Sequence, residues 1–252
     1  MNELNEQAAG LLEAVLNGGP RLSALPDSCR PRDAEQAYRI QQRLVERLGG
    51  RGGWKVGAAS PESAPHYAAL PARLLHEGHV ERRLADFTVG AIEAEVAFRL
   101  KHDLPARDSA YSRDEVLAAV ASAHAAIELV DSRFLDWPSG VDKLSQLADL
   151  QNCGCLVVGD GAADWQSLSL ERIEVALTIG GRMAVNTQGG NPAGDPAALL
   201  VWLANALPQT GQSLRAGEIV TCGSYTGKIV AEQPVDVEAV FTGIGRATLR
   251  LT

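Results

Sequence analysis

Hydrophobic and polar residues alternate most clearly in the segment "IEAEVAFRL", from Ile92 to Leu100. Every second residue is apolar, and the residues between them include Glu93, Glu95 and Arg99. A period of two predicts a half-buried β-strand. Two carboxylates therefore project from one face of one strand. They are either a solvated outer face or part of a metal site.

Helical periodicity and end signals predict four helices, at residues 5–17, 31–48, 112–127 and 195–207. Pairs of glycines end the first two. The third begins with Ser112 as N-cap and Glu115 at capping-box spacing. The fourth has Asp195 as N-cap and Pro196 in the first helical position.

The other ordered segments are short and read as strands. They are "GGWKVGAAS" and then six segments at residues 126–130, 155–159, 174–179, 218–223, 236–241 and 247–251. Residues 60–75, rich in Pro, Ala and His, predict a stretch of low order. The order of elements predicts an α+β protein with a helical N-terminal part that contains a short β segment, over residues 1–75, and a β-rich body over residues 76–252.

Composition narrows the functional class. The 252 residues are 46% hydrophobic and 21% charged, as in a soluble globular protein. A net charge of −8 disfavours nucleic acid and anionic membranes as partners. We find no signal-peptide pattern and no apolar run long enough to span a bilayer. The four cysteines are too few for a disulfide framework, so we expect buried, reduced thiols in a cytoplasmic protein.

A third glutamate changes the meaning of the first two. Glu128 lies inside the apolar segment "AAIELV". A buried carboxylate is costly unless its charge is compensated. A cation is one solution, and three carboxylates suit Mg²⁺ or Mn²⁺ better than zinc. An ion pair with Arg133 or another arginine is the alternative, and the spacing alone does not separate the two.

Lys55 is the candidate basic group. It lies between Trp54 and Val56 in a glycine-rich segment. A desolvated lysine there would act as an acid, a base or an anion clamp. The alternative is a surface lysine whose stem covers apolar groups while its ammonium stays in water.

At this point an ordered set of segments resembles a known family. The set is "GWKVGAAS", "IEAEVAFRL", "AIELVDSRF", "LADLQNCGCLVVG", "GDPAALLVWLANAL" and "LRAGEIVTCGSYTG". It is similar to the 2-keto-4-pentenoate hydratase group of the fumarylacetoacetate hydrolase superfamily, which also contains 4-oxalocrotonate decarboxylases. The resemblance extends from about residue 30 to 250. It implies a body of rolled sheets like the fumarylacetoacetate hydrolase C-terminal domain, a bound Mg²⁺ or Mn²⁺, and a homo-oligomer.

The resemblance also implies roles for individual residues of this chain. It makes metal ligands of Glu93, Glu95 and Glu128, catalytic groups of Lys55 and Glu77, and substrate-binding groups of Ser224 and Thr226. Glu77 stands where family members commonly carry an aspartate. The implied substrate is a small 2-oxo or 2-hydroxydienoic acid, whose carboxylate and adjacent oxygen would chelate the cation.

Three functions follow from the resemblance. The leading one is a metal-dependent hydratase that adds water to 2-hydroxypenta-2,4-dienoate, giving 4-hydroxy-2-oxopentanoate in aromatic-compound catabolism. The second is a 4-oxalocrotonate decarboxylase, which would need an extra cation near the mouth of the site, with Arg73 as the candidate. The third is a non-catalytic subunit that associates with a pathway partner enzyme.

Overall fold

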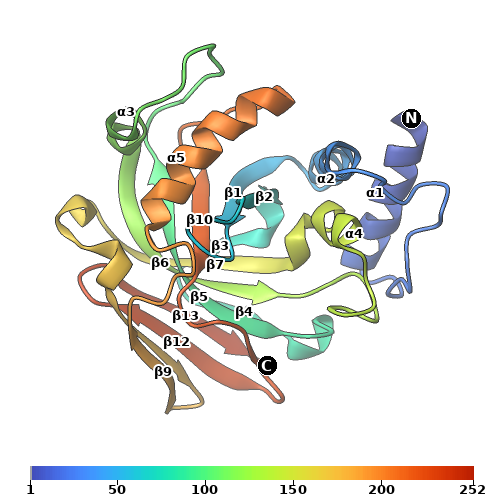
Figure 1. Ribbon diagram of the computed structural model, residues 1–252. Helices are drawn as coiled ribbons and strands as arrows, with labels where there is room; N and C mark the ends of the chain where they lie inside the picture. The colour runs from blue at the N-terminus through green and yellow to red at the C-terminus, as the bar shows by residue number, and fades with distance from the viewer. Residues whose placement is uncertain (1) are drawn as a thin grey trace.

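The computed structural model describes residues 2–252, which form two β-sheets flanked by helices (Figure 1). The larger sheet has the strand order β2-β1-β10-β5-β6-β7-β3, with β11 also paired to β5. Its strands are β1 (Arg51–Gly57), β2 (His66–Pro71), β3 (Leu75–Glu77), β5 (Ala91–Leu100), β6 (Val120–Val130), β7 (Cys153–Ala162), β10 (Ile219–Ser224) and β11 (Ile229–Val230).

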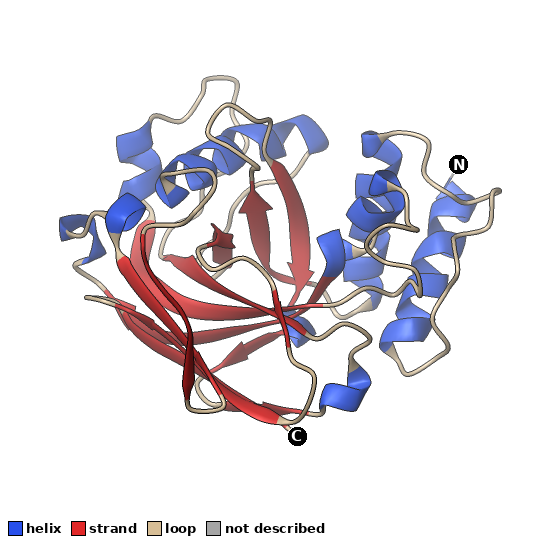
Figure 2. Cartoon of the chain, turned by 60° about the horizontal axis from the view of Figure 1, so that its bottom comes forward, coloured by secondary structure: helices blue, strands red, loops and turns tan. Residues whose placement is uncertain are grey.

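The smaller sheet has the order β4-β13-β12-β8-β9. Its strands are β4 (Val80–Arg82), β8 (Glu174–Ile179), β9 (Arg182–Gln188), β12 (Val235–Phe241) and β13 (Gly245–Leu251). Strand β13 packs against β6 and β7, and the larger sheet curls strongly around its concave side (Figures 1 and 2). The expected α+β class with a rolled sheet is confirmed.

The helices lie outside the sheets (Figure 2). Helices α1 (Asn2–Leu16) and α2 (Ala34–Arg47) pack on each other, and α2 also contacts α4 (Lys143–Ala148) and β2. Helix α5 (Pro196–Ala206) contacts α3 (Arg113–Ala118), β10 and β1. Strands β1 and β2 lie in the N-terminal part, where one short β segment is expected, and they belong to the same sheet as β5 and β6.

The central strand β5 follows its sequence pattern. Its apolar face, from Ile92 to Leu100, is buried, and the ring of Phe98 lies 5.0 Å from that of Trp165. Burying these side chains contributes roughly 1.5–3 kcal/mol for each large one. The opposite face carries the glutamates, so core packing on one side fixes the direction of the carboxylates on the other.

Two local predictions are wrong. The helix over residues 112–127 ends at Ala118, although the Ser112–Glu115 capping box is present. Residues Val120–Val130 instead form β6, which pairs with β5 on one side and β7 on the other. Its alanine-rich sequence suits a helix locally, but two neighbouring strands satisfy its backbone and override that preference. The stretch expected to be of low order contains β2.

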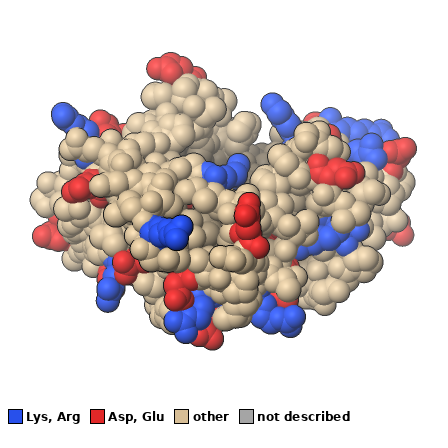
Figure 3. All heavy atoms as spheres, turned by 90° about the horizontal axis from the view of Figure 1, so that it is seen from below, with Lys and Arg blue, Asp and Glu red and all other residues tan. Residues whose placement is uncertain are grey.

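The remaining surface agrees with the composition. Both signs of charge are mixed on the face seen in Figure 3. All four cysteines are buried and unpaired, as expected. Within residues 2–252, no helix has the length and apolar character needed to cross a membrane.

Candidate metal centre

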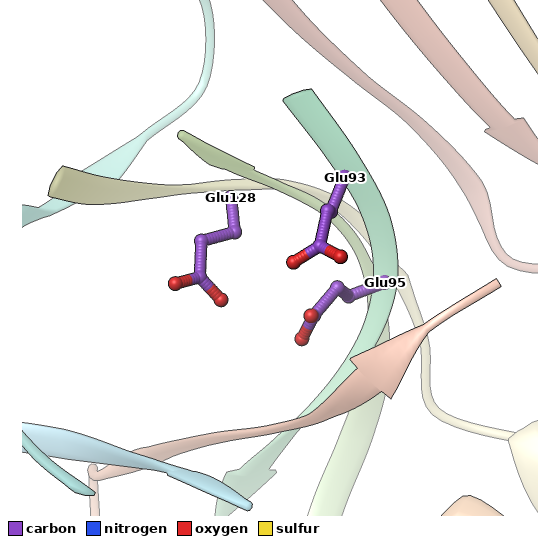
Figure 4. Close-up of side chains that lie close together, drawn as sticks. All are labelled: Glu93, Glu95 and Glu128. Atoms are coloured by element: carbon purple, nitrogen blue, oxygen red, sulfur yellow. The ribbon is translucent and has the colours of Figure 1, made fainter. Parts of the chain in front are cut away.

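Three glutamates converge because two strands pair in a particular register. Glu93 on β5 lies directly opposite Glu128 on β6, and Glu95 follows Glu93 by two residues on the same face. One carboxylate oxygen from each residue lies within 4.8 Å of the others. Figure 4 shows the three side chains pointing into one space on the concave side of the sheet. The question raised by the pattern of β5 is answered by geometry, since these carboxylates do not form a solvated outer face.

Burial makes this cluster electrostatically costly. Glu128 is fully buried, Glu95 is 3% exposed and Glu93 is half-buried. Burial, followed by the neighbouring carboxylates, raises the pKa of Glu95 to about 8 and also raises the pKa of Glu93. Like charges in a desolvated site disfavour the ionised forms. A cation held among the carboxylates would offset this cost.

Lys55 supplies part of that compensation. Its Nζ lies 2.5 Å from Glu128 Oε1 and 3.3 Å from the carbonyl oxygen of Gln151. Burial lowers the pKa of this lysine, but the carboxylates of Glu128 and Glu95 outweigh burial and raise it above its ordinary value. The ammonium is therefore charged at neutral pH. The alternative of an ammonium in water is excluded, because the side chain is 15% exposed and ion-paired.

One ammonium does not satisfy three carboxylates. Glu128 Oε2 is buried and has no hydrogen-bond partner among residues 2–252. Buried polar atoms are nearly always paired, so an orphaned carboxylate oxygen inside such a cluster needs an explanation. A hard divalent cation with oxygen ligands, such as Mg²⁺ or Mn²⁺, fits this donor set.

Arg133 does not neutralise Glu128. Its guanidinium makes an ion pair with the buried Asp149 and donates to the carbonyl oxygens of Asp149 and Cys153, both at 2.7 Å. Both partners of the pair are almost completely buried. The arginine alternative for Glu128 is therefore wrong, and Arg133 instead fixes the segment that follows β6.

The two expected substrate-binding residues lie at the end of β10 and in the turn that follows. Ser224 is opposite Glu95 in the strand register. Burial is the main cause of the raised pKa of Glu93, and a hydrogen bond from the Ser224 hydroxyl acts against it. Thr226 Oγ1 accepts a bond from the Ala94 amide at 3.1 Å. Ser224 therefore lies next to the cluster, and the hydrogen bond to Thr226 holds the turn against β5.

Two other expected residues lie apart from the cluster. The Glu77 carboxylate is 70% exposed and pairs with Arg99 at 2.9 Å, and none of its contacts within residues 2–252 is with Lys55. Arg73 donates to Asn17 at 3.0 Å, at the end of α1. It lines a hollow of about 710 Å³ that contains none of the three glutamates. Arg73 is therefore not the cation at the mouth of the site.

One charged residue near the cluster was not expected from the sequence. Lys228 follows the turn after β10 and is one of the charges acting on Glu93. The lysine at the end of the "GSYTGK" segment was the signal that could have found it.

Comparison with known proteins identifies the class. Residues 58–252 match the family model of the fumarylacetoacetate hydrolase C-terminal domain. The 2-keto-4-pentenoate hydratase of Paraburkholderia phymatum is 30% identical, with 97% of this chain and 95% of that protein covered. The 2-hydroxyhexa-2,4-dienoate hydratase of Comamonas testosteroni is also 30% identical, over 99% of this chain and 97% of that protein.

A solved structure shares the fold. The 4-oxalocrotonate decarboxylase of Pseudomonas putida G7, in complex with magnesium and adipate, superposes with a TM-score of 0.87 at 20% identity. The superposition covers 100% of this chain and 98% of that one. The chain therefore belongs to the fumarylacetoacetate hydrolase family, as the resemblance in the sequence implied.

Proposed function

We propose that this protein is a metal-dependent hydratase that adds water to 2-hydroxypenta-2,4-dienoate, giving 4-hydroxy-2-oxopentanoate. The observation that carries the proposal is the cluster of the half-buried Glu93 with the buried Glu95 and Glu128, with its orphaned oxygen and the charged Lys55 beside it. Relatives at 30% identity over nearly the whole chain are hydratases of such dienoates, which supports this reaction over others of the family.

The three glutamates would hold Mg²⁺ or Mn²⁺. When bound, this cation supplies Lewis acidity to the carboxylate and adjacent oxygen of a 2-oxo acid and stabilises negative charge on that oxygen. Glu93 and Glu128 face each other across two strands, so both can contribute oxygens without moving the backbone.

Lys55 acts as a charged donor in this proposal. Its raised pKa keeps the proton on Nζ at neutral pH, so it is suited to donate a hydrogen bond or a proton rather than to remove one. The dienol must lose its hydroxyl proton and gain a proton on its terminal carbon before water adds at C4. Lys55 places positive charge where the enolate oxygen develops, and Ser224 borders the same space. We assign no proton transfer to the exposed Glu77.

The decarboxylase is the second candidate, because it would use the same enolate. The observation in its favour is Lys228 beside Glu93, a cation suited to a second carboxylate. The cluster with Lys55 argues against a non-catalytic subunit, since such a subunit has no need of buried, mutually repelling carboxylates.

Assays with two substrates, together with a metal-binding measurement, separate these candidates. Purified, chelator-treated protein is mixed with 2-hydroxypenta-2,4-dienoate with and without Mg²⁺ or Mn²⁺, and loss of the dienol absorbance is followed together with product mass. Metal-dependent gain of one water supports the hydratase. Release of CO₂ from 4-oxalocrotonate without water gain would support the decarboxylase. Metal binding without either turnover would support the non-catalytic subunit.

We further propose a cytoplasmic homo-oligomer acting beside a pathway partner enzyme. The four buried, unpaired cysteines fit a reducing compartment. Size-exclusion chromatography with light scattering on the purified protein tests the oligomer, and a monomer at micromolar concentration would contradict it.

A further inference from the structure

The hollow of about 710 Å³ beside Arg73 lies on the face of the larger sheet that points away from the glutamates. Leu156 on β7 is opposite Glu128 in the strand register, so the neighbouring Cys155 points to the other face. Burial is the main cause of the raised pKa of the Cys155 thiol, and the guanidinium of Arg82 acts against it. Arg82 lines the hollow and therefore marks this opposite face. The sheet separates the hollow from the glutamate cluster.

We call this space the arginine hollow, because four arginines line it. They are Arg21, Arg73, Arg82 and Arg133. Two of the four already have carboxylate partners. Arg21 pairs with Asp131 at 2.8 Å, and Arg133 forms the buried ion pair with Asp149. These two arginines are neutralised within the protein and form part of the wall.

The other two arginines, Arg73 and Arg82, have no carboxylate partner. Arg73 donates to Asn17 Oδ1 at 3.0 Å and to the Leu16 carbonyl at 3.3 Å, and both acceptors are uncharged. No carboxylate of residues 2–252 lies within ion-pair distance of either guanidinium. Arg82 is half-buried, and a partly desolvated guanidinium with several N–H donors favours an anionic acceptor. The arginine hollow thus has two cationic groups without a counter-charge.

The acidic groups that line the arginine hollow do not cancel this charge. They are Asp86 and Asp131. Asp131 is bound to Arg21 and also accepts hydrogen bonds from the Thr88 and Val89 amides at 2.8 and 2.9 Å. Asp86 is exposed, and an arginine outside the lining, Arg83, lies 3.9 Å from it. The excess of positive charge is local, because the whole chain carries −8. A concave surface with one sign of charge attracts ligands of the other sign.

We propose that the arginine hollow binds a small organic anion with phosphate or carboxylate groups, held by the guanidinium groups of Arg73 and Arg82. Both kinds of group present pairs of oxygens that match the planar fork of an arginine. The volume of the hollow lies within the range of about 300–1,000 Å³ that is typical of small-molecule sites, so the ligand is larger than one inorganic phosphate. This ligand differs from the substrate, because the hollow contains neither Lys55 nor the three glutamates.

The first test measures anion binding by calorimetry on protein that has been stripped of metal and desalted. The probes are pyrophosphate for a phosphate-bearing ligand and tricarballylate for a carboxylate-bearing one. The variants are Arg82→Gln, Arg73→Gln and the control Arg182→Gln, which changes an exposed arginine on β9. We expect wild type and Arg182→Gln to bind at least one probe with a Kd of about 1 mM or lower. Arg82→Gln and Arg73→Gln should each bind it about tenfold or more weakly, the scale of one charge-assisted contact.

The two probes identify the ligand chemistry. Tighter binding of pyrophosphate would assign a phosphate-bearing ligand to the hollow, and tighter binding of tricarballylate would assign a carboxylate-bearing one. Failure of both probes to bind wild type would overturn the proposal. Equal weakening in Arg182→Gln and Arg82→Gln would also overturn it, because the attraction would then be unspecific. Circular dichroism melting without ligand checks the fold of each variant, and Arg82→Gln decides the outcome if Arg73→Gln is unstable, since Arg73 also contacts the end of α1.

A second measurement locates the bound probe. Hydrogen exchange followed by mass spectrometry should slow in residues 82–89, which border the arginine hollow, and stay unchanged in residues 91–97, which carry Glu93 and Glu95. Slower exchange in residues 91–97 alone would place the anion at the glutamate cluster and overturn the proposal. The result is independent of the proposed hydratase, because the test uses neither the dienoate nor a metal ion.

Discussion

Replacing Lys55 by methionine removes the ammonium that is paired with Glu128. The Lys55 side chain is 15% exposed and the Glu128 side chain is 1% exposed, so water cannot replace the lost partner. Removing one partner of a buried pair costs about 3–5 kcal/mol. Protonating a glutamate about 3 pH units above its ordinary pKa gives a similar cost of about 4 kcal/mol. For a chain of this size, this predicts a melting temperature lower by about 6–20 °C without metal.

The raised pKa of Lys55 determines how the stability contributed by the Lys55–Glu128 pair changes with pH. A group whose pKa is raised on folding stabilises the protein fully below its unfolded value and loses that contribution only as pH rises through the folded value. The full difference between Lys55→Met and wild type is therefore expected at neutral pH. Lys101→Met, at an exposed lysine, is the matched control and should leave the melting temperature unchanged.

Thermal unfolding followed by circular dichroism, with EDTA or with MgCl₂, is the assay. Mg²⁺ should stabilise Lys55→Met more than wild type, because the cation takes over the charge compensation that the lysine provided. A metal-free Lys55→Met variant that melts within about 2 °C of wild type would contradict a stabilising Lys55–Glu128 pair. An equal rise of both melting temperatures with Mg²⁺ would contradict the shared charge compensation.

Three further predictions concern the same region. Glu95→Gln should lower Mg²⁺ affinity by about tenfold or more, because one anionic ligand is lost, whereas Glu77→Gln should leave that affinity unchanged. Calorimetry measures both affinities. Equal Mg²⁺ affinities of Glu95→Gln and wild type would remove Glu95 from the ligand set. Mg²⁺ affinity of the wild type should rise with pH up to and through about 8. Burial and the neighbouring carboxylates raise the pKa of Glu95 to about 8, and the cation must displace the Glu95 proton. An Mg²⁺ affinity that calorimetry finds independent of pH would contradict this. Arg133→Met should destabilise the protein by about 3–5 kcal/mol, because it leaves the buried Asp149 without its partner, and a urea unfolding midpoint equal to that of wild type would argue otherwise.

Local sequence patterns predicted an element correctly where the tertiary environment favours the same element. The alternation of β5 predicted both its apolar face and the shared face of Glu93 and Glu95. Asp195 and Pro196 correctly predicted the start of α5. Each of these features depends on residues within a few positions of one another, so the sequence contains all the relevant interactions.

Other features depended on partners distant in sequence. Residues Val120–Val130 read as a helix and became a strand because β5 and β7 pair along both of its edges. The partner of Glu128 could not be chosen from spacing, since Lys55 is 73 residues away and reaches it only because the sheet curls. Arg133, which is nearer to Glu128 in the sequence, is ion-paired with Asp149 instead.

The family, the strand that carries two of the proposed ligands, and the residue types of the proposed cation site follow from the sequence. Which charges meet depends on the tertiary structure. Register brought Glu128 opposite Glu93, whereas Glu77 pairs with Arg99 at the surface. Electrostatic interactions depend on distance and burial, and strand pairing sets both for residues that are far apart in the sequence.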